Sequence, residues 1–219
     1  MTTTTFNRAR KIAVIDYGVG NLYSVERALK SFTENYIITE DPADIAAAQA
    51  IILPGVGAFG AGMEGLRRRG LVQPIKNFAQ TGKLILGICL GAQILLSEGY
   101  EFGHWEGLGI IEGQTIPFSS LALGTKIPHI GWNILRPKKE DGWERTILAG
   151  LGQEISAYFV HSFILQPKYD QDINAVSQYG GREFTSVIRR ENIYGCQFHP
   201  EKSGGVGLAI IRNFINLID

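Results

Sequence analysis

Apolar and polar positions divide the chain into two parts with different patterns. In the first part, short apolar runs alternate with stretches whose apolar residues recur at helical spacing. The pattern predicts buried strands at residues 12–16, 36–39, 50–53 and 84–88, and helices at residues 21–32, 62–69, 72–79 and 90–97. Strands that alternate with helices at this pitch indicate a parallel sheet covered by helices on both faces.

From residue 109 to residue 197 the apolar runs are shorter and are separated by Gly, Pro, Asp and Asn. They predict further strands, some antiparallel, at residues 109–111, 115–118, 157–160, 175–178, 185–189 and 194–198. A last helix is expected over residues 207–217. No repeat or linker divides the sequence, so we expect a single α/β domain over residues 11–219. Its central sheet should be mixed, mostly parallel and flanked by helices, and residues 1–10 should form a flexible extension.

Composition narrows the classes of function. The chain has 219 residues, and 21 Lys and Arg balance 21 Asp and Glu, so no basic footprint for nucleic acid is expected. No segment resembles a secretory signal or approaches the roughly 20 apolar residues that span a bilayer. Two cysteines are too few for a disulfide scaffold, and no residue cluster has the spacing of metal ligands. We expect a cytoplasmic protein without metal, cofactor, nucleic-acid or membrane partner.

The sharpest chemical motif is Gly87-Ile88-Cys89-Leu90-Gly91, between a predicted strand and a predicted helix. A nucleophile on such a turn has strained dihedral angles, and flanking glycines avoid clashes with its neighbours. The turn also places Cys89 at a helix N-terminus, where the helix dipole favours the thiolate. The alternative interpretation is a buried core cysteine beside turn glycines.

A second motif, His199-Pro200-Glu201, follows a predicted strand near the C-terminus. His199 and Glu201 are two positions apart in an extended stretch, so both side chains can point the same way. A carboxylate beside an imidazole fixes its tautomer and stabilises the imidazolium. Combined with Cys89, these residues form a candidate Cys-His-Glu triad in which His199 is the general base and then the general acid; taken alone, the triplet is more typical of a surface loop.

A third motif is the glycine-rich segment Pro54-Gly55-Val56-Gly57, directly after a predicted strand. Acyl transfer from an amide needs hydrogen-bond donors for the developing oxyanion. The backbone N–H groups of Val56, Gly57 and Leu90 are candidates, because Leu90 follows the nucleophile. An ordinary strand-to-helix loop remains an alternative, and a phosphate-binding loop is disfavoured because no Lys-Ser/Thr pair follows the glycines.

Residues 87–93 and 198–201 together resemble the class I (triad) glutamine amidotransferases. Within that family the sequence is most similar to glutaminase subunits of imidazole glycerol phosphate synthase, from histidine biosynthesis. The segments that carry this resemblance span nearly the whole chain, at residues 16–22, 53–59, 128–133, 158–163 and 199–203.

The resemblance implies a glutaminase that forms a cysteinyl thioester and releases glutamate. It implies that Gln93 holds the substrate, and that the backbone of Gly57 and of Ser162 and Phe163 binds the amino and carboxylate ends. Ammonia would pass through a channel to a (β/α)₈-barrel cyclase. Four residues match positions at that subunit interface: Asn21, Trp132, Tyr158 and Lys202. Without the resemblance, Trp132 is equally a candidate core residue and Lys202 a solvated surface residue.

Two other functions are compatible with these motifs. A paralogous glutaminase could feed ammonia to a different synthase, such as a sugar-modifying amidotransferase, with an identical triad. A scaffold or regulatory subunit could keep the fold without turnover, although the presence of Cys89, His199 and Glu201 argues against it.

Overall fold

Parallel strands form the centre of the sheet in a computed structural model that describes residues 11–139 and 142–218. The strands are β1 (Ile12–Ile15), β2 (Tyr36–Thr39), β3 (Ala50–Gly55), β4 (Leu84–Cys89) and β13 (Ile193–Cys196). They lie in the order β2-β1-β3-β4-β13, and each neighbouring pair is parallel. The carboxyl ends of β3, β4 and β13 therefore meet at one edge. The predicted extension over residues 1–10 lies outside the described residues.

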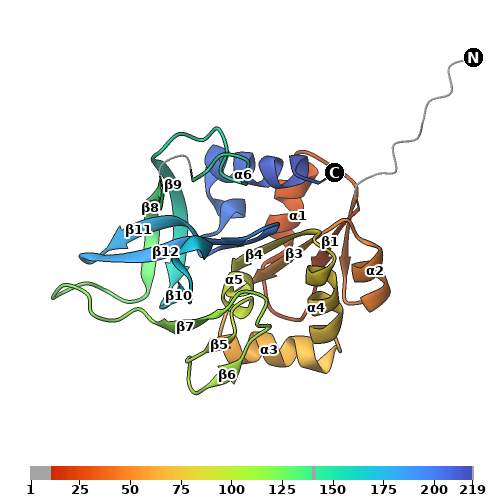
Figure 1. Cartoon of the computed structure of the whole chain (residues 1–219), viewed down its shortest axis with the longest axis horizontal. Helices are drawn as coiled ribbons and strands as arrows, with labels where there is room; N and C mark the ends of the chain where they lie inside the picture. Colours follow the sequence, from red (N-terminus) through yellow and green to blue (C-terminus); the bar gives the residue numbers. More distant parts are fainter. Residues whose placement is uncertain (1–10, 140–141, 219) are drawn as a thin grey trace, which may run out of the picture.

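Helices cover both faces of this parallel centre (Figure 1). They are α1 (Leu22–Lys30), α2 (Pro42–Ala47), α3 (Phe59–Arg68), α4 (Val72–Gln80), α5 (Leu90–Ile94) and α6 (Gly204–Asn216). Successive strand residues point to opposite faces, so Ile12 and Val14 pack with α1 and α6, whereas Ala13 and Ile15 pack with α2, α3 and α4. The two apolar clusters of the core result from this alternation.

A largely antiparallel extension continues the sheet beyond β13. It contains β12 (Arg182–Arg190), β11 (Ile173–Tyr179), β10 (Phe163–Pro167), β7 (Gly113–Pro117), β5 (Glu98–Gly99), β6 (Trp105–Glu106), β8 (His129–Pro137) and β9 (Ile155–His161). The main path runs β13-β12-β10-β7-β5-β6, while β11 joins β12 to β8, and β8 pairs with β9. Within this extension, β5 and β7 form the one parallel pair among the described strands. The expected α/β fold with a mixed sheet, parallel at its centre, and flanking helices is confirmed.

One local prediction from the sequence was wrong, and several elements were not expected. Residues 109–111 are not a strand: Gly109 has φ +62°, and the N–H groups of Gly109, Ile110 and Ile111 donate to the carbonyls of Leu95 and Leu96 after α5. This segment therefore caps a helix end instead of joining the sheet. The elements that the sequence did not predict are helix α2 and strands β5, β6, β8 and β10.

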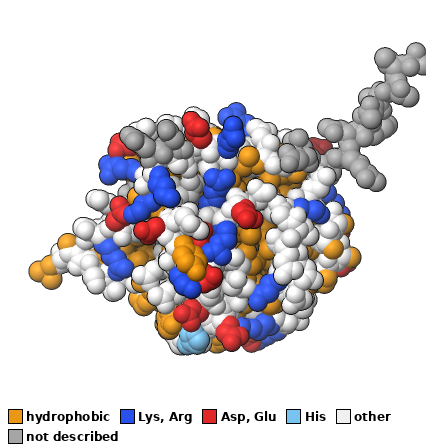
Figure 2. Space-filling model, viewed as in Figure 1, with side chains coloured by type: hydrophobic (Ala, Val, Ile, Leu, Met, Phe, Trp, Pro, Cys, Tyr) orange, Lys and Arg blue, Asp and Glu red, His pale blue; other side chains and the backbone are white. Residues whose placement is uncertain are grey.

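The distribution of charged side chains on the surface reflects the equal numbers of basic and acidic residues. On the face in Figure 2, Lys and Arg side chains lie interspersed with Asp and Glu side chains. Among the described residues, no helix has both the length and the apolar character to cross a bilayer.

Candidate active site

Cys89 lies at the junction of β4 and α5, on the turn that the Gly-x-Cys-x-Gly pattern predicts. Its backbone has φ 52° and ψ −108°, a strained conformation for a residue with a side chain. Gly91 is required because a Cβ there would overlap the carbonyl oxygen of Leu53 in β3. A Cβ at Gly87 would lie 2.7 Å from the carbonyl oxygen of Gly91. Gly91 thus lets the turn pack directly against β3, and Gly87 lets the start of α5 pack closely on β4.

His199 and Glu201 follow β13, which lies beside β4 in the sheet. Because β4 and β13 are parallel, with Cys196 opposite Ile88, their carboxyl ends deliver Cys89 and His199 to the same edge. His199 Nδ1 lies 2.8 Å from Glu201 Oε1, and the two side chains are only 1% and 2% exposed. The short 3₁₀ helix η2 (Pro200–Lys202) turns Glu201 back towards His199. The alternative of a solvated surface loop is therefore wrong.

The environment of His199 favours its protonated form. Burial alone would lower the pKa of its imidazole, but the interactions with Cys89 and Glu201 outweigh burial and raise the pKa from 6.5 to about 9. His199 Nε2 is buried and has no hydrogen-bond partner among the described residues. A protonated imidazole with a free Nε2–H can serve as an acid towards a bound substrate.

The loop after β3 approaches Cys89 from the neighbouring strand, since Gly55 pairs with Cys89 in the β3–β4 register. A Cβ on Gly55 would collide with the hydroxyl of the buried Tyr17. Gly57 has φ +104°, a conformation that favours glycine, and Val56 is 38% exposed. The loop thus holds backbone groups of Val56 and Gly57 beside the cysteine turn, where the sequence predicts the oxyanion donors.

Most of the predicted site residues line one pocket of about 370 Å³. Its lining residues are Val56, Gly57, Ala58, Cys89, Gln93, Glu101, Phe102, Pro128, Val160, His161, Ser162, Phe163 and His199. Leu90 and Glu201 lie just behind this lining, Leu90 as the first residue of α5 and Glu201 against His199. The fold therefore brings the predicted nucleophile, base, oxyanion loop and substrate-binding residues together; their roles stay predictions.

Hydrogen bonds fix the side chain of Gln93 at the pocket wall. Its Nε2 donates to Gln197 Oε1 at 3.2 Å and to the carbonyl oxygen of Phe163 at 3.4 Å. Gln197 is fully buried, and its own Nε2 lies 4.0 Å from Cys89 Sγ. Gln197 thus connects Gln93 to the cysteine, a contact that the sequence analysis missed.

Glu101 is a second pocket residue that the sequence analysis missed. It lies in the loop between β5 and β6, and its Oε2 accepts a 2.8 Å hydrogen bond from the backbone N–H of Phe59, the first residue of α3. This bond directs the carboxylate to the rim of the Cys89 pocket. No local sequence motif marks Glu101, because its loop reaches the site only through the tertiary fold.

The four predicted interface residues lie on neighbouring elements outside the pocket. Trp132 and Tyr158 are a cross-strand pair of β8 and β9, with ring centroids 6.1 Å apart, and Trp132 is 58% exposed. Trp132 is therefore not a core residue. Asn21 caps α1 by accepting a hydrogen bond from the N–H of Ser24, and Lys202 is exposed in η2, which contacts both α1 and β9.

The exposed face of β8 is apolar beyond Trp132. Ile130 is 59% exposed and Ile134 is 39% exposed, and they flank Trp132 at alternate positions on the same strand face. Tyr23, on the exposed side of α1, is 71% exposed. An exposed apolar surface of this kind is typical of a protein–protein contact.

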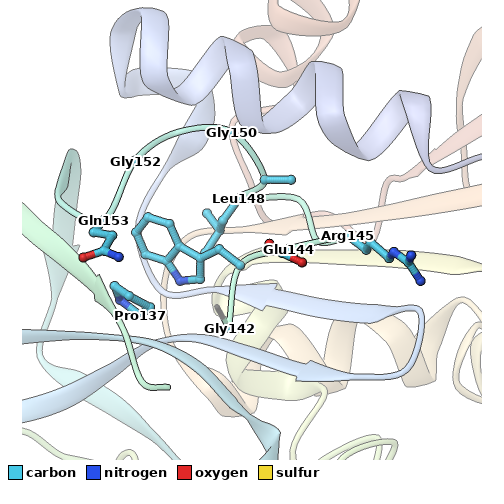
Figure 3. A pocket seen from close by; sticks show the side chains of 10 residues that line it. Pro137, Gly142, Glu144, Arg145, Leu148, Gly150, Gly152 and Gln153 are labelled. Carbon is cyan, nitrogen blue, oxygen red and sulfur yellow. The ribbon is translucent and has the colours of Figure 1, made fainter. Parts of the chain in front are cut away.

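A separate hollow of about 390 Å³ opens beside the loop around Gly150 (Figure 3). It is lined by apolar residues such as Pro137 and Leu148, and its charged residues are Glu144 and Arg145. The described residues that line it include no Cys, His or Ser. It holds neither a thiol nor a paired imidazole, so we assign the candidate active site to the Cys89 pocket.

Comparison with known proteins agrees with the geometry. The profile of the family described as glutamine amidotransferase class-I matches residues 13–217. The chain is 47% identical over 210 residues to imidazole glycerol phosphate synthase subunit HisH 1 of Legionella pneumophila (strain Lens), covering 94% of this chain and 99% of that protein. It is 41% identical over 208 residues to subunit HisH of Symbiobacterium thermophilum, covering 95% of this chain and 94% of that protein.

Solved structures share the fold. A glutamine amidotransferase crystal structure matches with a TM-score of 0.72 at 18% identity, covering 94% of this chain and 98% of that chain. The structure of PurLQS from Thermotoga maritima matches with a TM-score of 0.71 at 23% identity, covering 95% of this chain and 99% of that chain. The chain belongs to the class I glutamine amidotransferase family. Within that family, the full-length relatives above carry the name of one particular subunit, HisH of imidazole glycerol phosphate synthase.

Proposed function

We propose that this protein is the glutaminase subunit of imidazole glycerol phosphate synthase. It hydrolyses L-glutamine to L-glutamate and delivers the ammonia to a (β/α)₈-barrel cyclase subunit. The observation that carries the proposal is the single pocket that holds Cys89 on a strained turn beside the buried His199–Glu201 pair. The names of relatives at 47% and 41% identity over nearly their full length support the pathway.

In the first half-reaction, His199 Nε2 takes the thiol proton of Cys89, and Sγ attacks the carbonyl carbon of the glutamine side-chain amide. Backbone N–H groups of Leu90 and of Val56 or Gly57 stabilise the negative charge that forms on the amide oxygen. As the C–N bond breaks, His199 Nε2 gives its proton to the departing nitrogen, so that ammonia leaves and a glutamyl thioester remains. The raised pKa of His199, about 9, keeps this proton available at neutral pH.

In the second half-reaction, water attacks the thioester while His199 Nε2 accepts a proton from the water. The C–S bond breaks, glutamate leaves and the thiolate–imidazolium pair returns. Glu201 accepts the hydrogen bond from His199 Nδ1, which keeps Nε2 directed at the substrate.

The ends of the pocket suit the two charged ends of glutamine. Glu101 is the acidic lining residue, so we assign the substrate ammonium to its carboxylate. The backbone of Gly57, Ser162 and Phe163 holds the remaining α-amino acid atoms, and Gln93 contributes its side-chain oxygen, because its Nε2 is already engaged within the protein.

The cyclase docks on the exposed surface around Trp132, Tyr158, Asn21 and Lys202. The apolar face of β8 supports this proposal, since aromatic and aliphatic side chains form the centres of stable interfaces. The proposed chemistry also requires the free thiol of Cys89, and free thiols persist in reducing compartments, so we assign the protein to the cytoplasm.

Glutamate release tests the proposal. It is measured with the chain alone, with the barrel cyclase of the same organism, and with cyclase plus its aminoimidazole-carboxamide nucleotide substrate. We expect strong stimulation in the last mixture. If the cyclase gives no stimulation while a glutamine-analogue electrophile still labels Cys89, the protein is a glutaminase for a different synthase, such as a sugar-modifying amidotransferase. If the analogue does not label Cys89, the chain is not a glutaminase.

A further inference from the structure

Two buried histidines outside the triad link strand β8 to the substrate pocket. His129 Nδ1 lies 2.9 Å from His161 Nε2, and His161 Nδ1 lies 2.9 Å from the carbonyl oxygen of Phe163. His129 is 2% exposed and His161 is 5% exposed. The proposed reaction uses neither imidazole, although His161 and Phe163 both line the pocket.

The direction of each hydrogen bond follows from one fact, that a carbonyl oxygen only accepts. His161 Nδ1 therefore carries a proton and donates to the Phe163 carbonyl. Burial lowers the pKa of His161 to about 3 and that of His129 to about 4, so both rings are neutral at pH 7. His161 Nε2 is then an acceptor, His129 Nδ1 donates to it, and His129 Nε2 accepts from Asn133 Nδ2 at 3.4 Å.

The Phe163 carbonyl needs these side-chain donors because β7 supplies none. Phe163 lies opposite Pro117 in the β10–β7 register, and the adjacent pair is hydrogen-bonded, since the N–H of Phe118 donates to the carbonyl oxygen of Ser162. Bonded and non-bonded pairs alternate in an antiparallel ladder, so the N–H and C=O of Phe163 both face away from β7. The Nδ1–H of His161 and the Nε2–H of Gln93 both donate to this carbonyl. Its two lone pairs are thus occupied, so the group that Phe163 can offer to a substrate is its N–H, a donor suited to a carboxylate.

Stacking holds both imidazole rings in place. His161 stacks on Phe118, with centroids 5.4 Å apart and an interplanar angle of 16°. His129 stacks on Tyr179, with centroids 4.0 Å apart and an angle of 27°. A ring flip that exchanges Nδ1 and Nε2 would break this stacking in either histidine. The packing therefore fixes the direction of the hydrogen bonds.

We infer that His161 is a positioning residue for the carboxylate end of glutamine: it orients the Phe163 peptide, and His129 holds His161 in the tautomer that does so. This inference rests on the proposed glutaminase function. The N–H and C=O of one strand residue point to the same edge, so anchoring the carbonyl also aims the Phe163 N–H. Loss of the anchor weakens binding of the α-amino acid end and leaves the reactivity of Cys89 unchanged.

Two substitutions at one position separate the two hydrogen bonds of His161. In His161→Asn, the amide nitrogen occupies the place of Nδ1 and can still donate to the Phe163 carbonyl. In His161→Gln, the longer side chain reaches the place of Nε2 and loses that donor. Each variant and the wild type are treated with the chloroketone analogue of L-glutamine, which carries the α-amino acid end, and with iodoacetamide, which lacks it.

For His161→Gln we expect the half-saturating concentration of the chloroketone to rise about tenfold or more, because a buried carbonyl loses a donor. The maximal inactivation rate and the iodoacetamide rate should match the wild type, and His161→Asn should restore tight binding. The inference is overturned if the His161→Asn and His161→Gln variants behave alike, or if the iodoacetamide rate falls together with chloroketone binding.

If His161→Gln does not fold, His129→Phe serves instead. It keeps an aromatic ring and removes the donor to His161, and unchanged chloroketone binding in this variant would contradict the inference. A wild type that iodoacetamide alkylates and the chloroketone does not label contradicts the proposed function itself.

Discussion

The substitution Glu201→Gln removes a buried negative charge and keeps the shape of the side chain. Raising the pKa of His199 from 6.5 to about 9 corresponds to about 3 kcal/mol of stabilisation of the imidazolium, at 1.36 kcal/mol per pKa unit. Cys89 and Glu201 both contribute, and a hydrogen bond to a charged group is worth about 1.5–3 kcal/mol. We therefore expect glutamine turnover to fall by about 10- to 100-fold, at about 1.4 kcal/mol per factor of ten.

The same substitution changes two pH profiles. Turnover of the wild type should decline as pH rises through about 9, where His199 loses the proton it gives to ammonia, and in Glu201→Gln this decline should begin at lower pH. Because the pKa of His199 is higher in the folded than in the unfolded chain, its contribution to stability is complete below pH 6.5 and is lost as pH rises through about 9. The substitution should make the free energy of unfolding less dependent on pH in this window.

The assays are glutamate release and urea unfolding from pH 6 to pH 10. The matched control is Glu98→Gln. Glu98 forms a second His–Glu pair, with His104, whose nitrogen and oxygen are also 2.8 Å apart, but this pair lies on the surface. An exposed pair contributes little, so the control should leave both profiles unchanged. If Glu201→Gln leaves turnover and its alkaline decline as in the wild type, Glu201 does not hold His199 protonated and this reasoning is refuted.

Three further substitutions test separate parts of the account. Cys89→Ala should abolish glutamine-dependent synthesis by the complex and preserve synthesis from added ammonium salts; loss of both would contradict ammonia transfer between subunits. Gly91→Ala should destabilise the chain by about 1–3 kcal/mol in urea unfolding, because its Cβ would overlap the Leu53 carbonyl, whereas Gly205→Ala, with open space around its Cβ, should not. Trp132→Ala should leave unfolding unchanged within about 0.5 kcal/mol and weaken cyclase binding in calorimetry by about 2 kcal/mol; unchanged affinity would exclude this surface as the docking site.

Local chemistry explains why the triad could be predicted from the sequence. The Gly-x-Cys-x-Gly pattern records a steric requirement of one turn, and the overlap at Gly91 is its physical cause. His199 and Glu201 are close in the chain, so their hydrogen bond needs only a short turn. Strands β1, β3 and β4 are predictable for a similar reason, since each is a short, fully buried apolar run.

Other features depend on contacts between distant segments, which the sequence pattern does not record. Strand β8 has apolar residues on its exposed face, at Ile130, Trp132 and Ile134, so its pattern is not that of an ordinary half-buried strand. Glu101 and Gln197 reach the pocket only through the packing of separate elements.

The central claim is that Cys89 forms a glutamyl thioester, and acid-quench mass spectrometry tests it most directly. The protein, with its cyclase and nucleotide, is mixed with L-glutamine, quenched in acid during turnover and digested. The account predicts one glutamyl group on the peptide that contains Cys89, and no such adduct in Cys89→Ala. Turnover of glutamine without any adduct on that peptide, or turnover that persists in Cys89→Ala, would contradict it.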